Sequence, residues 1–120
     1  MKNIIQSFIV LGIAVLSIAT VQAQSTNKKI AKESFEVVGV CGMCEKRIEK
    51  AALIKGVISV EWDKEAQQVD VIYKPKKTSL DDIKQAIAAV GHDTRGVSAP
   101  DSAYAELPQC CAYRDGVEVH

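Results

Sequence analysis

The sequence predicts an α+β domain with the ferredoxin-like order βαββαβ, followed by a C-terminal extension. Two observations lead to this prediction. Apolar and polar residues alternate in three short segments, as in half-buried strands, and apolar residues recur with helical spacing in two others. This order folds into a sandwich of one four-stranded antiparallel sheet with two helices on one of its faces.

The first strand and the first helix are predicted within residues 32–56. In the segment KESFEVV, Phe35 and Val37 lie on one face of an extended chain. From Cys44 onward, apolar residues recur with helical spacing and charged residues lie between them, which indicates an amphipathic helix. We expect this helix to end at Gly56, because a lysine followed by a glycine suits a helix C-terminus.

Residues 57–73 predict a hairpin. Two alternating segments, VISVEWD and QQVDVIY, are joined by a short polar turn. Each segment places three apolar side chains on one face, as expected for strands that cover a core. These side chains are Ile58, Val60 and Trp62 in the first segment and Val69, Val71 and Tyr73 in the second.

A second helix and a last short strand complete the predicted domain. Thr78 or Ser79 can cap the helix, and the aspartates that follow are favourable near the positive end of the helix dipole. The apolar stripe of this helix consists of Leu80, Ile83, Ile87 and Val90. Gly91 ends the helix, and the segment HDTRGV supplies the fourth strand.

Composition shifts divide the chain into four segments: a signal peptide at 1–23, a flexible lead-in at 24–31, the domain at 32–97 and the extension at 98–120. The signal peptide is predicted from a positive start, an uncharged apolar run and a small-residue exit, with cleavage after Ala23. A membrane anchor is the alternative interpretation of this run. We expect an exported, periplasmic protein whose mature chain is not embedded in a membrane.

Charge and composition narrow the function classes. Fifteen basic residues balance fifteen acidic ones, so we expect no nucleic-acid partner. The chain has two histidines, and neither a Ser/His/Asp constellation nor a pair of carboxylates stands out, so we expect no enzymatic activity.

The segment VCGMCEKR places Cys41 and Cys44 three residues apart at the predicted start of the first helix. The positive end of a helix dipole stabilises thiolates, and thiolates prefer soft ions such as Cu(I), Hg(II) or Zn(II). In an oxidising compartment the same pair suits a disulfide. The residues alone therefore leave open a metal site, a disulfide-stabilised interaction domain and a small thiol oxidoreductase.

Residues 33–97 resemble the heavy-metal-associated domain family. The resemblance is carried by the C-x-x-C motif and by the segments KGVISVEWD, VDVIY and IKQAIAAVGHD. Exported copper chaperones and the periplasmic mercury-binding protein share these motifs. The resemblance implies that Cys41 and Cys44 bind one soft ion, Cu(I) first and Hg(II) or Zn(II) otherwise, in a shallow, exposed site. It also implies transfer of the ion to or from a membrane transporter such as a P-type ATPase, with the protein a monomer or a metal-bridged dimer.

Two positions depart from the family pattern. The family usually has a methionine, packed beneath the metal-binding loop, where this chain has Gly39. His92 stands where many members have tyrosine, and the resemblance places it beside the metal-binding loop as a candidate third ligand. The alternative is a surface histidine at the end of a helix.

The adjacent pair Cys110 and Cys111 in the extension allows three interpretations. The two thiols join Cys41 and Cys44 in a site of three or four thiolates, which suits Zn(II) or a Cu(I) cluster. They form disulfides with each other or with another chain, although adjacent cysteines are bridged only with strain. They remain a separate thiol pair. The apolar surroundings in LPQCCAY favour the first, because they indicate a segment that packs back onto the domain.

Overall fold

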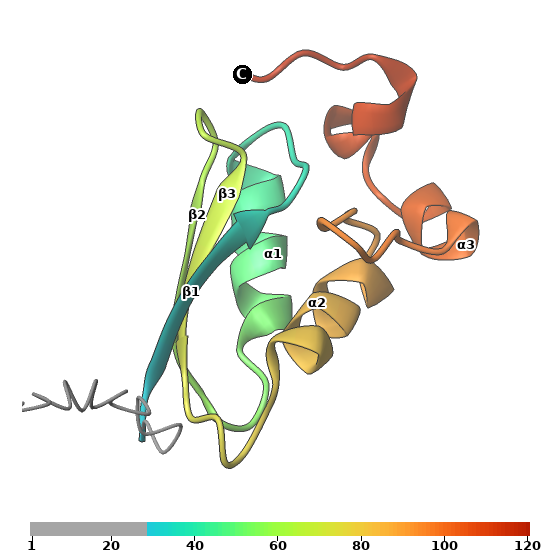
Figure 1. Cartoon of the computed structure of the whole chain (residues 1–120). Coiled ribbons are helices and arrows are strands. Elements are labelled where there is room, and N and C mark those ends of the chain that lie inside the picture. Colours follow the sequence, from blue (N-terminus) through green and yellow to red (C-terminus); the bar gives the residue numbers. More distant parts are fainter. Residues whose placement is uncertain (1–28) are drawn as a thin grey trace, which may run out of the picture.

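A computed structural model describes residues 29–120, so the predicted signal peptide and most of the predicted lead-in lie outside the described residues. Figure 1 shows a sheet with two helices on one face and a C-terminal segment beside them. The elements are β1 (Ala31–Glu36), α1 (Gly42–Ala52), β2 (Val57–Asp63), β3 (Gln68–Tyr73), α2 (Leu80–Ala89), α3 (Asp101–Ala105) and the short 3-10 helices η1 (Gln109–Cys111) and η2 (Tyr113–Asp115). Within residues 29–120, no helix is long and apolar enough to cross a membrane.

The sheet is antiparallel, and its strands lie in the order β1-β3-β2. The described residues form three strands rather than the four predicted. The segment expected to be the fourth strand makes only isolated bridges, because Thr94 pairs with Val97 three residues later as well as with Val37. The two backbone hydrogen bonds between Thr94 and Val97 close a tight turn, and Gly96 takes a positive φ of 89° within it. The chain turns back there before it can extend along β1.

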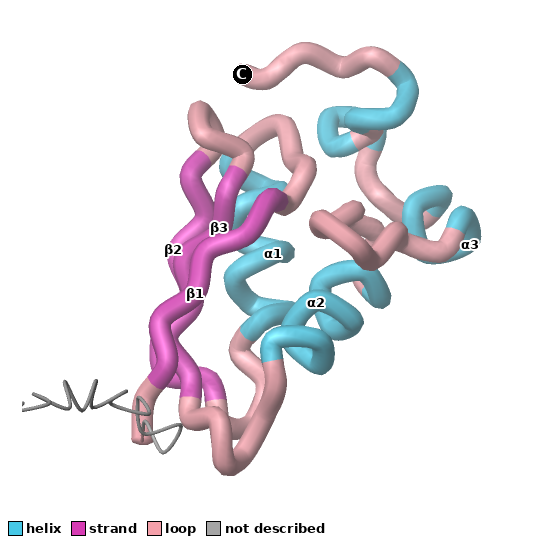
Figure 2. The backbone as a smooth tube through the Cα atoms, viewed as in Figure 1, coloured by secondary structure: helices cyan, strands magenta, loops and turns pink. Residues whose placement is uncertain are grey.

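Helices α1 and α2 cover one face of the sheet (Figure 2). The predicted cap of α2 is Ser79, whose Oγ accepts a hydrogen bond from the Asp82 N–H at 3.1 Å. Gly91 follows the helix with a φ of 102°, a conformation that favours glycine at a helix C-terminus. The helices bury their stripes against the sheet, and Ile48, Ile83 and Ile87 are fully buried there.

The core confirms most of the predicted faces. Val69 and Val71 of β3 are fully buried, and Tyr73 and Trp62 are nearly so. The prediction for Ile58 is wrong, since this side chain is 47% exposed. The register of β2 shifts between Val57 and Ser59, and such a bulge turns the following side chains to the other face of the strand.

The C-terminal segment, residues 98–120, packs against the domain. Leu107 and Tyr113 are partly buried against the core, and Cys111 is fully buried within it. The segment approaches the end of α2 so closely that a Cβ atom on Gly91 would lie 2.9 Å from the Ala103 carbonyl oxygen. Its last residue returns to the loop between β1 and α1, where the His120 N–H donates to the Val40 carbonyl at 3.1 Å (Figure 1).

Candidate metal centre

Cys41 and Cys44 lie at the start of α1, at the end of the loop that follows β1. Cys41 is the N-cap residue, and its carbonyl accepts the first helical hydrogen bond from the Glu45 N–H at 3.0 Å. Its side chain makes no capping hydrogen bond. The two Sγ atoms are 4.0 Å apart, and both cysteines are free thiols. Helix α1 therefore presents both sulfur atoms at the positive end of its dipole.

The indole of Trp62 packs against this loop. Trp62 is buried, and its Nε1–H donates to the Val37 carbonyl at 3.0 Å. A Cβ atom on Gly39 would lie 2.8 Å from Cζ2 of the ring and 3.2 Å from Cβ of Cys44. Glycine stands at position 39 because the Trp62 ring already fills the space that a side chain would need.

Cys111 from η1 completes a cluster of three sulfur atoms. Its Sγ lies 3.9 Å from Sγ of Cys41, and the Sγ atoms of Cys41, Cys44 and Cys111 all lie within 4.8 Å of one another. Cys110 lies at the edge of this cluster, with its Sγ 4.0 Å from Sγ of Cys111 and 3.7 Å from Sδ of Met43. The structure thus brings the C-terminal cysteines to the C-x-x-C motif.

The thiols of the cluster have different acidities. Burial opposes ionisation of Cys41, but the backbone amides of Cys44 and Met43 and the neighbouring thiols outweigh it and lower the pKa of Cys41 to about 7. Burial, together with the neighbouring sulfur atoms, raises the pKa of Cys111 to about 11, although Arg47 acts in the opposite direction. Burial and the thiols of Cys111 and Cys41 also raise the pKa of Cys110. Cys41 therefore ionises more readily than Cys110 and Cys111, and its negative charge disfavours ionisation of those two thiols.

Arg47 is a charged neighbour that sequence reasoning missed. Its Nη1 donates to Sγ of Cys111 at 3.3 Å. The spacing contains a signal that would have found it, because a residue three positions after Cys44 lies on the same helix face.

The structure does not bring His92 into the cluster. Its ring is fully buried, its Nδ1 is 2.8 Å from the Val38 carbonyl oxygen, and it stacks on Tyr113 with 5.7 Å between ring centroids. The alternative expectation of a surface histidine is wrong, because the ring is buried. Burial lowers the pKa of His92 and outweighs the contact with Val38, which acts in the opposite direction. The ring is therefore neutral at pH 7 and is packed inside the protein.

The site is covered rather than exposed. The resemblance implies a shallow, open pair of thiols, yet Cys41 is 7% exposed and Cys44 and Cys111 are fully buried. The reason is the C-terminal segment, in which η1 and the residues after it lie over the start of α1. Met43 is the exposed sulfur-bearing side chain at this edge, with 52% of its surface accessible.

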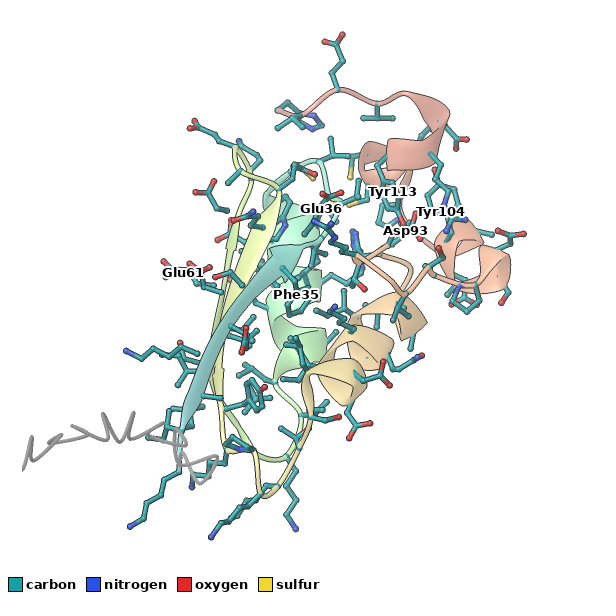
Figure 3. The ribbon with its side chains drawn as sticks, in the orientation of Figure 1. Phe35, Glu36, Glu61, Asp93, Tyr104 and Tyr113 are labelled. Atoms are coloured by element: carbon teal, nitrogen blue, oxygen red, sulfur yellow. The ribbon has the colours of Figure 1, made fainter. Side chains whose placement is uncertain are left out.

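A cluster of charged and aromatic side chains attaches this cover to the domain. Figure 3 shows Asp93, Tyr104 and Tyr113 gathered where the C-terminal segment meets the loop after α2. The guanidinium of Arg114 donates to both carboxylate oxygens of Asp93, at 2.7 and 3.2 Å, and to the Ala99 carbonyl at 2.9 Å. The Tyr113 hydroxyl donates to the Gly91 carbonyl at 2.6 Å and accepts from the Asp93 N–H at 2.9 Å. No local pattern around Asp93 or Arg114 predicts this attachment, because the two residues lie 21 positions apart.

Comparison with known proteins assigns the family. The profile of the heavy-metal-associated domain matches residues 34–93, half of the chain. This chain therefore belongs to the heavy-metal-associated domain family. The matched residues end before α3, so Cys110 and Cys111 lie outside the part of the chain that defines the family.

Solved structures of the same fold include named copper proteins. The CopZ metallochaperone is 35% identical, with a TM-score of 0.52 over 53% of this chain and 98% of its own. The N-terminal domain of a potential copper-translocating P-type ATPase from Bacillus subtilis, in its Cu(I)-loaded state, is 33% identical, with a TM-score of 0.52 over 54% of this chain and 84% of its own. Oxidized MerP from Ralstonia metallidurans CH34 is 27% identical, with a TM-score of 0.51 over 54% and 93%. A comparison with curated proteins gave no match.

Proposed function

We propose that this protein is an exported carrier of a soft metal ion, which it binds through Cys41 and Cys44 and exchanges with a membrane transporter. The observation that carries the proposal is the pair of thiols 4.0 Å apart at the start of α1, with a third thiol beside them. The family membership of the chain supports a metal-binding domain, and we propose the role of a carrier rather than of an enzyme for it.

The donor set fits a soft ion. The cluster contributes sulfur atoms, which prefer Cu(I), Hg(II) or Zn(II) to hard cations such as Mg²⁺ or Ca²⁺. The lowered pKa of Cys41 makes its thiolate available near neutral pH, and a thiolate is the form that binds a soft ion. Cu(I) is our first choice, because two of the similar structures are named as a metallochaperone and as a domain in its Cu(I)-loaded state.

A transporter partner is proposed from the same likenesses, since one of the similar structures is the N-terminal domain of a P-type ATPase. The face of α1 beside the exposed Met43 carries three cations, Lys46, Arg47 and Lys50. This face suits a partner surface that is negatively charged. Export to the periplasm follows from the predicted signal peptide at 1–23 and is part of the proposal.

Elemental analysis of protein purified from its native compartment tests the proposal. We expect about one copper ion per chain in the reduced protein, and none in a variant that carries Cys41→Ser and Cys44→Ser. Mercury or zinc in place of copper would correct the choice of ion. Protein that contains none of these metals and takes up none when reduced would contradict the proposal. Sequencing the N-terminus of the same sample tests export, because removal of residues 1–23 leaves Gln24 first.

A further inference from the structure

We propose that Cys111 is the third thiolate ligand of the bound ion, so that the C-terminal segment, residues 98–120, closes the metal site and has to lift before the ion is transferred. This inference rests on the proposed function and adds to it the regulation of release. The residues that would regulate release lie outside the part of the chain that matches the family.

The distances between the sulfur atoms fit a three-coordinate site. With a metal–sulfur bond of about 2.3 Å, sulfur atoms lie about 4.0 Å apart around a trigonal ion and about 4.6 Å apart across a linear one. Cys41 and Cys44 are 4.0 Å apart, Cys41 and Cys111 are 3.9 Å apart, and the three atoms lie within 4.8 Å of one another. Two of the three spacings therefore already match a trigonal ion and the third lies within 4.8 Å, whereas a linear pair would have to spread Cys41 and Cys44 apart.

The surroundings of Cys111 suit a thiolate bound to a metal. As its bond to the ion forms, the Cys111 thiol gives its proton to solvent, and the sulfur keeps the electron pair. Three thiolates around Cu(I) carry a net charge of −2, and Arg47, which donates to Sγ of Cys111 at 3.3 Å, reduces it to −1. A buried charge needs such a partner, and Cys111 is fully buried.

Cys111 owes its position to the attachment of the segment. Tyr113 and Arg114 follow it within three residues, and both are bonded to the loop after α2, at Gly91 and Asp93. The backbone of η1 is held by the hydrogen bond from the Cys111 N–H to the Pro108 carbonyl at 2.8 Å. These contacts hold Sγ over the two sulfur atoms of the loop before any ion arrives, so the cost of ordering this ligand is already met in the folded protein.

Cys110 provides a matched control within the same segment. It has the same chemistry and the neighbouring position, but its Sγ contacts Sδ of Met43 at the partly exposed edge of the cluster and it is not a member of the three-sulfur group. The proposal therefore assigns different effects to the same substitution at two adjacent residues.

The experiment measures the coordination of Cu(I) in the reduced protein by X-ray absorption, together with the rate at which a chelator removes the ion. We expect three sulfur ligands in the wild type and in Cys110→Ser, but two in Cys111→Ser. Loss of a ligand should also speed removal of Cu(I) by about tenfold or more in Cys111→Ser. Even residues that only hydrogen-bond to a metal ligand change metal affinity by about 10- to 100-fold. Because Cys111 is buried, Cys111→Val serves as a second variant if the serine form does not fold.

The outcomes separate this inference from the proposed function. Two sulfur ligands in the wild type, or equal effects of the substitutions at Cys110 and Cys111, would overturn the role of Cys111 while metal binding stands. Failure of the wild type to bind Cu(I), or unchanged binding after Cys41→Ser and Cys44→Ser, would instead overturn the proposed function. Faster removal of Cu(I) from Cys111→Ser but not from Cys110→Ser, with one fewer sulfur ligand, would support both the role of Cys111 and the binding of the ion at this site.

Discussion

Replacement of Arg114 by alanine should open the cover of the metal site without removing any sulfur atom. Arg114 bonds to Asp93 and to the Ala99 carbonyl, and its guanidinium lies 4.6 Å from the centre of the Tyr104 ring. The Arg114 and Asp93 side chains are 28% and 26% exposed, so the pair is partly screened by solvent. The contact of Arg114 with Asp101 contributes little, because the Asp101 side chain is fully exposed.

The magnitude follows from these contacts. A hydrogen-bonded pair of charges contributes about 1.5 to 3 kcal/mol, and a cation over an aromatic ring adds about 0.5 to 1 kcal/mol at an exposed site. Allowing for the screening, we expect Arg114→Ala to weaken the attachment of the segment by about 2 kcal/mol. Since about 1.4 kcal/mol corresponds to a factor of ten, the open population should rise by roughly 30-fold.

Thiol labelling in the metal-free protein measures this population. Cys111 is fully buried, so it reacts only from the open state, and its labelling rate follows the open population when closing is fast. We expect Cys111 to be alkylated roughly 30-fold faster in Arg114→Ala, as read by mass spectrometry of peptides. The control is Arg95→Ala, because Arg95 is exposed and forms no ion pair in the described part of the chain. An unchanged rate in Arg114→Ala, or an equal rise in both variants, would refute the reasoning.

Three further predictions concern the support of the site. Gly39→Ala should lower the free energy of unfolding by about 1 to 3 kcal/mol in urea titrations, because its Cβ would press on the Trp62 ring; Gly42→Ala, with open space around it, should not, and equal effects would contradict this. Tyr113→Phe should lower the free energy of unfolding in the same titrations by about 1 to 3 kcal/mol, because the Gly91 carbonyl and the Asp93 N–H both lose their hydrogen-bond partner. An unchanged free energy of unfolding would show that these hydrogen bonds are dispensable. Burial opposes ionisation of Asp93, but Arg114 and the Ala99 N–H outweigh it and hold its pKa below the ordinary 3.8. Its contribution to stability is therefore present above that value and lost as the pH falls through the lower folded-state pKa, so the urea midpoint should fall less between about pH 5 and pH 2 in Asp93→Asn than in the wild type.

Local patterns in the sequence predict the domain well, because each element has its own signal. The alternation in QQVDVIY and the helical spacing of Ile83 and Ile87 come from short stretches of chain, and both faces are buried as expected. The prediction of a fourth strand is wrong, and the alternation of apolar and polar residues gives no sign of the reason. Thr94 and Val97, three residues apart, bond to each other around Gly96, and this tight turn ends the extended segment before it can form a strand.

The candidate site likewise has one part that local sequence predicts and another part that it does not. The C-x-x-C motif and the start of α1 follow from local sequence, and the structure places Cys41 and Cys44 in contact. The position of Cys111 over them, 70 residues from Cys41, depends on how the extension docks. Arg114 and Asp93 contribute to that docking, and no periodic pattern links two such positions. The departure at Gly39 is likewise explained by a residue distant in sequence, since the ring of Trp62 reaches this loop from β2.

A competition titration of the reduced protein with Cu(I) and a chromophoric chelator tests the central claim most directly. If Cys41 and Cys44 hold the ion, the wild type will withdraw one equivalent of Cu(I) from the chelator, and the variant with both cysteines changed to serine will withdraw none. If the wild type leaves Cu(I) with the chelator, or if the double variant competes as well as the wild type, this pair of thiols is not the metal site.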